Sequence, residues 1–127
     1  MVIDASALLA YFQDEPGADV VAAALTRGVS VSCISWTEVA GKLIGAGKSE
    51  QEVEKALADL EMEIMPFEKE QMKLAAYFYA RRKPYRLSLG DSVTLALAEY
   101  LGESVLTAEH SWSKLPYLRV EVKLIRP

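Results

Sequence analysis

The order of strand-like and helix-like segments limits the fold of this chain more than any other feature of its sequence. Short apolar runs that fit strands occur at residues 1–4, 31–34, 62–67, 104–107 and 120–125. The longer segments between them have helical spacing and cover residues 5–13, 15–28, 35–47, 49–61, 68–83 and 88–102. Strands that alternate with helices predict a three-layer α/β/α domain around a parallel sheet of about five strands.

Residues 1–127 are expected to form one domain, because the length is ordinary for a domain and no linker or repeat interrupts the chain. Residues 108–118 fit a short helix or a loop. In the helix predicted over 68–83, the residues expected to face the core are Met72, Ala75, Ala76 and Tyr79. Pro66 indicates that the third strand lies at a sheet edge or ends there.

Four acidic residues map to what this topology makes one edge of the sheet. Asp4 ends the first strand, Glu38 lies one turn into the helix after the second, and Glu109 lies two residues past the fourth. Asp91 begins a helix that returns to the fourth strand through a tight turn at Gly102, so the helix start lies beside the strand's end. Ligands of such sheets bind beyond the carboxyl ends of the strands, which predicts a site at this edge.

Helix capping is the competing explanation for each acid taken alone. The stretches Ser35–Glu38 and Ser88–Asp91 both fit a capping box. Asp4 or Ser6 can cap the first helix, and Thr107 the short one. Convergence favours a shared cation, because neighbouring carboxylates raise one another's pKa and a divalent ion removes that conflict.

The candidate ligands are all oxygen atoms, which decides the class of cation. They are the four carboxylates and, through water, the hydroxyls of Ser6 and Thr107. Hard oxygen ligands favour Mg²⁺ or Mn²⁺ over zinc, and Mg²⁺ is usually completed by a substrate phosphate. The pattern therefore indicates phosphodiester hydrolysis by a metal-activated water.

Charge and cysteine content exclude several other classes of protein. The net charge of −4 makes the surface as a whole a poor attractant for nucleic acid, so any such binding is local or assisted. The single cysteine, Cys33, permits no disulfide within the chain and fits a small buried hydrophobe.

No stretch approaches the ~20 apolar residues of a membrane span, and no basic leader precedes the first strand. A reducing cytoplasm is the expected location.

At this point the sequence resembles a known family. The stretches VIDASALLAYF, SWTEV, LSLGDSVTLALA and VLTAE, in this order and spacing, resemble the PIN domain and, more narrowly, VapC, the toxin of bacterial type II toxin–antitoxin pairs. The closing VEVKLIRP is also similar to a VapC ending. The resemblance covers essentially the whole chain.

The resemblance implies a Mg²⁺- or Mn²⁺-dependent endoribonuclease with a parallel sheet between helices. The family's acids map onto Asp4, Glu38 and Asp91; its fourth is usually an aspartate, where this chain has Glu109 in LTAEH. Glu109 departs from the family pattern by its longer arm, which puts the fourth ligand in doubt; the expectation is that it binds through water or reaches another ion. The resemblance also implies a homodimer, a cognate VapB-type antitoxin, and operator DNA bound only through the complex of the two.

Basic and aromatic residues ahead of Asp91 are weaker candidates. Arg86, and with it Arg82, is the best candidate for contact with an RNA backbone, although a solvated helix end explains such residues as well. The nearby tyrosines fit core or dimer packing better than base stacking. His110 is interpreted as an exposed loop residue rather than a general base.

Three other classes of function are the alternatives to a metal-dependent nuclease. A phosphatase with an aspartyl nucleophile would place a second acid two residues after Asp4, where this chain has Ser6. A signalling domain that accepts a phosphate would need an aspartate after the third strand, and only Glu68 is offered there. A non-catalytic PIN-like binding module, whose acids only cap helices, is the remaining rival.

Overall fold

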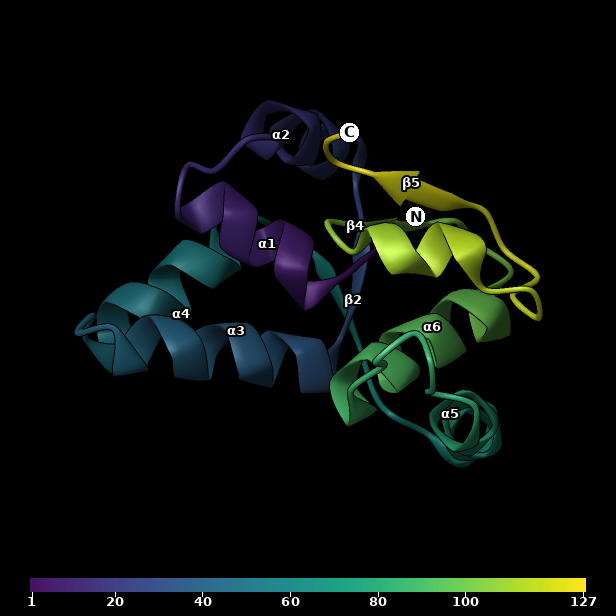
Figure 1. The fold of residues 1–127 in the computed structure, drawn as a ribbon. Coiled ribbons are helices and arrows are strands. Elements are labelled where there is room, and N and C mark those ends of the chain that lie inside the picture. Colours follow the sequence, from purple (N-terminus) through teal and green to yellow (C-terminus); the bar gives the residue numbers. More distant parts are fainter.

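A five-stranded parallel sheet runs through the middle of the molecule, which the computed structural model describes over all residues 1–127 (Figure 1). Its strands are β1 (Val2–Ile3), β2 (Ser30–Ser32), β3 (Glu63–Met65), β4 (Val105–Thr107) and β5 (Val122–Leu124). They lie in the order β3-β2-β1-β4-β5, and each neighbouring pair is parallel. The predicted parallel sheet is confirmed, and β3, which ends just before Pro66, is an edge strand as expected.

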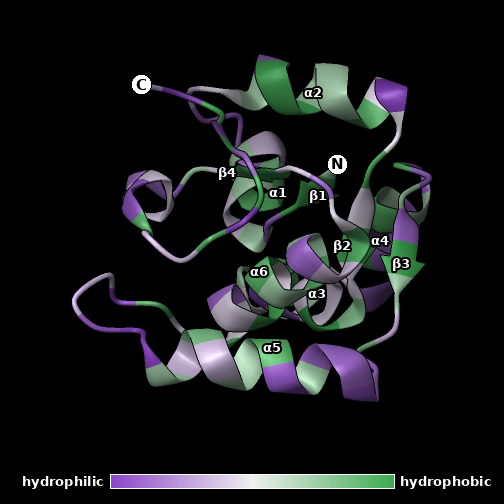
Figure 2. Ribbon diagram, turned by 90° about the vertical axis from the view of Figure 1, so that its right-hand side faces the viewer, coloured by the Kyte–Doolittle hydropathy of each residue, from purple (hydrophilic) through white to green (hydrophobic).

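Helices cover both faces of this sheet (Figure 2). One face carries α1 (Ala5–Phe12), α2 (Ala18–Arg27), α3 (Cys33–Gly45) and α4 (Glu50–Ala58), and the other carries α5 (Lys69–Ala80), α6 (Leu89–Leu101) and a short 3-10 helix, η1 (His110–Lys114). Side chains of a strand alternate between faces, so Ile3 packs with α1 to α4 while its neighbour Val2 packs with α5 and α6. The two resulting apolar cores confirm the three-layer architecture.

The boundary between β2 and α3 differs from the sequence-based expectation. Residues 33 and 34 were expected in the strand, but α3 begins at Cys33, and Ser32 caps it by accepting a hydrogen bond from the backbone N–H of Ile34 at 3.2 Å. The expected capping box at Ser35–Glu38 is therefore wrong, and Cys33 is only partly buried. Serine caps a helix through its own hydroxyl. Here the capping serine lies inside an apolar stretch that fits a strand, so the start of the helix is not recognised from the sequence.

The buried face of α5 also differs from the expected one. Gln71, Ala75 and Phe78 face the core, whereas Met72 and Tyr79 are 53% and 38% exposed. The helix packs along α6 on one side only, and the side-chain amide of Gln71 donates a hydrogen bond to the Pro66 carbonyl at 2.9 Å. Gln71 is buried although its Oε1 atom accepts no hydrogen bond, and its presence in the core rotates the buried stripe away from the one that apolar spacing predicts.

No helix of this structure combines the length and the apolar character that a membrane span requires.

Candidate active site

Asp4 lies at the carboxyl end of β1 and is almost completely buried, with 2% of its surface exposed. Its backbone N–H continues the sheet by donating to the Leu106 carbonyl, and its carboxylate caps α1. Ser6 Oγ and Thr107 Oγ1 donate to the same carboxylate oxygen, Oδ2, at 2.6 and 3.0 Å. No hydrogen bond reaches the other oxygen, Oδ1, so half of this buried carboxylate has no partner in the chain.

Burial raises the pKa of Asp4 from 3.8 to about 6. The hydrogen bond from Ser6 opposes this shift, and the negative charge of Asp91 adds to it. A cation placed beside the free oxygen stabilises the ionised form of a carboxylate that burial makes costly to ionise. A serine or asparagine would cap the helix as well without this cost of burying a charge, so capping alone does not account for an aspartate here.

Asp91 serves two purposes at the start of α6. It forms the predicted capping box with Ser88: the Asp91 N–H donates to Ser88 Oγ at 3.0 Å, and the Ser88 N–H donates to Asp91 Oδ2 at 2.9 Å. Burial raises the pKa of Asp91 as well, and the charge of Glu38 raises it further. Oδ1 of Asp91 accepts no hydrogen bond, so capping occupies only one side of this carboxylate.

Glu38 reaches the same edge from α3, although it lies further into the helix than expected because α3 begins early. Its Oε2 pairs with Lys42 Nζ at 3.1 Å, an exposed ion pair one turn along the helix. Its Oε1 lies so close to α6 that a Cβ added at Gly90 would be 2.8 Å away. The glycine thus permits the close approach of Glu38 to the start of α6.

The three acids form one electrostatic unit. Asp91 acts on the pKa of Asp4, and Glu38 acts on the pKa of Asp91. In each of the three carboxylates one oxygen has a partner in the chain and the other accepts no hydrogen bond. As placed, however, no three acidic, histidine or cysteine side chains are arranged to hold a metal ion between them.

The donor set nevertheless fits a hard divalent cation. Each acid offers one free oxygen, all three come from the carboxyl edge of the sheet, and burial of Asp4 penalises a negative charge that has no counter-ion. The contacts that hold the second oxygens of Glu38 and Asp91 are both exposed to solvent.

Glu109 stands apart from the other acids. It is exposed, follows β4 by two residues, and its backbone N–H donates to Thr107 Oγ1 at 3.0 Å. Its side chain has no hydrogen bond or ion pair. The structure therefore does not bring Glu109 into the group formed by Asp4, Asp91 and Glu38.

Ser6 and Thr107 act on Asp4 directly. Their hydroxyls lie 3.2 Å apart and both donate to the Asp4 carboxylate. Ser6 Oγ also accepts from the Ala108 N–H at 3.0 Å, which joins the end of β1 to the end of β4. These two residues fix the orientation of Asp4 and leave its free oxygen facing away from them.

A buried hydroxyl pair next to the acids was not anticipated from the sequence. Ser35 Oγ and Thr94 Oγ1 are 2.9 Å apart, and no more than 1% of either residue is exposed to solvent. Ser35 lies three residues before Glu38, and Thr94 three residues after Asp91, so the pair joins α3 to α6 one turn from each acid. Their polar character inside apolar helix faces was the only sequence signal that could have revealed them.

The basic residues ahead of Asp91 are placed differently from one another. Arg82 lies over the ring of Tyr79, with its guanidinium carbon 4.3 Å from the ring centre, and donates to the Tyr79 carbonyl. Arg86 is exposed, with a left-handed backbone (φ 58°), and has no ion pair. His110 is exposed, and its ring Nε2 lies within hydrogen-bond distance of the Arg126 carbonyl oxygen, at 3.0 Å.

A model of the PIN domain family matches residues 1–117. The chain belongs to the PIN domain family. This PIN domain is 30% identical over 115 residues to a VapC ribonuclease of Mycobacterium bovis and to ribonuclease VapC42 of Mycobacterium tuberculosis, covering 84% of this chain and 88% of each relative. The resemblance to VapC inferred from the sequence is confirmed.

Solved structures agree on the fold of this PIN domain. A toxin–antitoxin complex from Klebsiella pneumoniae superposes with a TM-score of 0.70 at 22% identity, covering 91% of this chain and 92% of the matched chain. VapBC2 from Rickettsia felis, bound to a promoter DNA fragment, gives a TM-score of 0.73 at 10% identity over 97% and 96% of the two chains. At these identities the likeness establishes the fold alone.

Proposed function

We propose that this PIN domain, residues 1–127, is an endoribonuclease that hydrolyses RNA phosphodiester bonds with Mg²⁺ or Mn²⁺. The observation that carries the proposal is the buried carboxylate of Asp4, whose free oxygen lies in one electrostatic unit with Asp91 and Glu38. The ribonuclease names of the relatives support the choice of RNA as substrate. The rival of a capping-only module leaves the burial and the free oxygen of Asp4 unexplained.

The residues of the chain have two roles in this mechanism: some would bind the cation, and others orient a carboxylate that binds it. A divalent cation, when bound, supplies charge neutralisation and activates water for attack on phosphorus. Asp4, Asp91 and Glu38 would hold it, Ser6 and Thr107 keep the Asp4 carboxylate oriented, and Glu109 lies outside this group. The hydroxyl of the attacking water forms a bond to phosphorus while the bond between phosphorus and the 3′-oxygen breaks. The proton released by the water goes to that 3′-oxygen, so the products carry a 5′-phosphate and a 3′-hydroxyl.

Product ends test this mechanism directly. Purified protein incubated with RNA and Mn²⁺ should yield 5′-phosphate and 3′-hydroxyl ends, and both excess EDTA and Asp91→Asn should abolish cleavage. Asp91→Asn keeps an oxygen for the Ser88 N–H, so its stability is expected to match the wild type and serves as the folding control. Cyclic phosphate or 3′-phosphate ends, or full activity in EDTA, would contradict a metal-activated water.

We further propose that the protein is the toxin of a type II pair in the cytoplasm, a homodimer that is held inactive by a VapB-type antitoxin and meets operator DNA only through it. The VapC names of the relatives support this, and the acidic net charge is compatible with a basic partner segment. Expression alone should arrest growth, and co-expression of the neighbouring small reading frame should restore it. An absence of any growth effect in the native host, with soluble active protein present, would argue against a toxin.

A further inference from the structure

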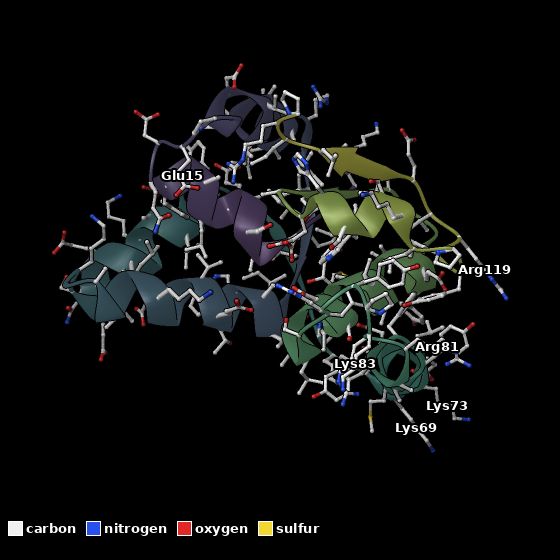
Figure 3. The ribbon with its side chains drawn as sticks, in the orientation of Figure 1. Glu15, Lys69, Lys73, Arg81, Lys83 and Arg119 are labelled. Atoms are coloured by element: carbon white, nitrogen blue, oxygen red, sulfur yellow. The ribbon has the colours of Figure 1, made fainter.

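One flank of α5 carries a row of basic and aromatic residues at four-residue spacing. Lys69, Lys73, Tyr77 and Arg81 follow one another at intervals of about 6 Å along the helix axis. All four are exposed, and none of the three cations has an ion-pair partner. Residues 69–86 hold six Lys or Arg and one Glu, although the chain has a net charge of −4. In Figure 3 the labelled basic residues of α5 and its loop gather on one side of the molecule, away from Glu15.

A cavity of about 240 Å³ opens beside this row. It is lined by Lys73, Leu74, Tyr77, Glu99, Tyr117 and Arg119, which come from α5, from α6 and from the segment between η1 and β5. Figure 3 shows Arg119 near the same side as Lys73 and Arg81. Positive charge, aromatic rings and one acid thus meet in a single hollow.

The aromatic part of the cavity is held in place by contacts within the chain. The rings of Tyr77 and Tyr117 meet edge to face, with centres 5.9 Å apart, and the Tyr117 hydroxyl donates to the Arg81 carbonyl at 2.9 Å. The Arg81 guanidinium lies 3.6 Å from the centre of the Tyr77 ring and donates to the Tyr77 carbonyl. Stacking therefore positions this guanidinium in advance, while 43% of Tyr77 stays exposed.

The polar part of the cavity adds acceptors and donors of the right kind for a nucleotide. The Arg119 backbone N–H donates to Glu99 Oε1 at 2.9 Å, and Oε2 of Glu99 accepts no hydrogen bond. A free carboxylate oxygen accepts N–H groups from a base edge. Lys73, Arg81 and Arg119 supply the charge that binds phosphates, and an exposed ring provides a face on which a base stacks.

The geometry points to a subsite for a nucleobase of single-stranded RNA in the cavity between α5 and residues 117–119. The cavity is separated from the acids by the length of α6 between Asp91 and Glu99, eight residues or about 12 Å along the helix. It would therefore hold a nucleotide a short distance along the strand from the scissile bond, with Lys69 and Lys73 beyond it. This subsite rests on the proposed ribonuclease function and would contribute to its choice of RNA.

Binding without cleavage isolates the subsite. In EDTA, the affinity for a single-stranded RNA of about eight nucleotides is measured by fluorescence anisotropy at several salt concentrations for wild type, Tyr77→Ala and Lys73→Glu. Tyr77→Ala should weaken binding roughly tenfold or more, and Lys73→Glu should reduce the slope of log K against log salt by about 1. Tyr77→Phe keeps the ring and should bind as the wild type does, which separates stacking from loss of fold.

Lys48→Glu is the matched control, since Lys48 is exposed in the turn between α3 and α4, at the end of the molecule away from α5 (Figure 1). It should change affinity far less than Lys73→Glu. Wild-type affinity in both Tyr77→Ala and Lys73→Glu would overturn the subsite. The subsite would also be overturned if the two variants bound RNA normally but no longer associated with a second copy of the chain or with a protein partner. The surface would then be an interface with that partner.

The outcomes for the subsite and for the nuclease are distinguishable. A protein that cleaves RNA with Mn²⁺, but whose cavity variants bind and cleave like the wild type, refutes the subsite alone. A protein that fails to cleave, yet loses RNA affinity in Tyr77→Ala and Lys73→Glu, supports the subsite and refutes the ribonuclease.

Discussion

The two oxygens of the Asp4 carboxylate lie in different environments. One carboxylate oxygen receives the hydroxyls of Ser6 and Thr107 and so fixes the entry to α1. The other oxygen accepts no hydrogen bond, although only 2% of the residue is exposed. Asp91 repeats the arrangement with its capping box. Capping and cation binding, which compete as explanations of the sequence, are compatible because they use different oxygens.

The metal-free protein is expected to become less stable as Asp4 ionises. Because the folded-state pKa, about 6, lies above the unfolded value of 3.8, the folded state binds the proton more tightly, and stability falls as the pH rises from about 4 to about 6. The shift corresponds to at most about 3 kcal/mol. In EDTA, Asp4→Asn should therefore be more stable than the wild type at pH 7 and lose this advantage near pH 4. Urea unfolding at the two pH values measures the difference, and a large loss of stability in Asp4→Asn at pH 7 would favour a pure capping role.

Glu109 is expected to matter less than Asp91. Its side chain is exposed and lies outside the group of coupled acids, so we expect it to be at most a weak or outer contact for a cation. Glu109→Ala should lower turnover less than Asp91→Ala, raised Mn²⁺ should partly restore it, and Glu109→Asp should keep most of the activity. Equal inactivity of Glu109→Ala and Asp91→Ala at every Mn²⁺ concentration would make Glu109 a direct ligand.

At the scale of the elements, the distance between α3 and α6 sets the spacing of the acids. Two features control it: the buried Ser35–Thr94 hydrogen bond, and the absence of a side chain at Gly90, against which Glu38 Oε1 lies. None of Ser35, Thr94 and Gly90 bears a charge, and none needs to touch the substrate. Each can therefore be altered without removing an acid.

Gly90→Ala should separate activity from stability. The added Cβ would lie 2.8 Å from Glu38 Oε1, which is the far end of a flexible and partly exposed side chain, so Glu38 is displaced at little cost to the fold. Alanine in a helix is otherwise favoured over glycine by roughly 0.5–1 kcal/mol. We expect unchanged or higher stability with turnover reduced roughly tenfold or more. Gly41→Ala on α3, where an added Cβ meets nothing within 4 Å, is the control and should keep full activity.

The Ser35–Thr94 pair is expected to position the helices. Ser35→Ala leaves the buried Thr94 hydroxyl unsatisfied and should cost about 1–3 kcal/mol in unfolding free energy. Ser35→Ala combined with Thr94→Val removes both hydroxyls and should recover much of that loss, while half-maximal activity still requires more Mn²⁺ than the wild type needs. Thr94→Ser keeps the bond and should behave normally. A double variant with wild-type metal dependence would reduce the pair to a packing feature.

At the scale of the whole molecule, the acids at the sheet edge are matched by a basic stretch, residues 69–86, formed by α5 and the loop that follows it. The acids gather where β1, β2 and β4 end, and six of the fourteen Lys or Arg residues lie within residues 69–86. A net charge of −4 conceals this division, because a sum over the sequence carries no information about place. RNA is expected to meet the basic side before the acids.

Cation binding by the folded protein should appear as thermal stabilisation. A ligand that binds only the native state at 100 times its dissociation constant adds about 2.7 kcal/mol. We expect Mn²⁺ to raise the melting temperature of the wild type by several degrees and to have little effect on a variant with both Asp4→Asn and Asp91→Asn. Equal shifts in the two proteins would place the binding elsewhere, and no shift in the wild type would favour a non-catalytic module.

The sequence by itself determined the layers, the parallel sheet, the edge position of β3 and the capping box of α6. Each follows from spacing within a few residues or from the alternation of elements, which local physics encodes. Local spacing failed where two signals overlapped, as at Ser32, and where a polar residue, Gln71, is buried in the core with only its amide N–H bonded.

Only the tertiary structure decided which atoms are free and which side chains meet. The bond between Thr107 and Asp4 joins residues 103 positions apart, and that between Ser35 and Thr94 joins residues 59 apart. Contacts at such separations depend on how the helices pack on the sheet, where shifts of a fraction of an ångström matter. No local sequence pattern predicts packing at that precision. The sequence therefore indicated that carboxylates gather at one edge, whereas the burial of Asp4, its free oxygen and the exclusion of Glu109 from the group came from packing.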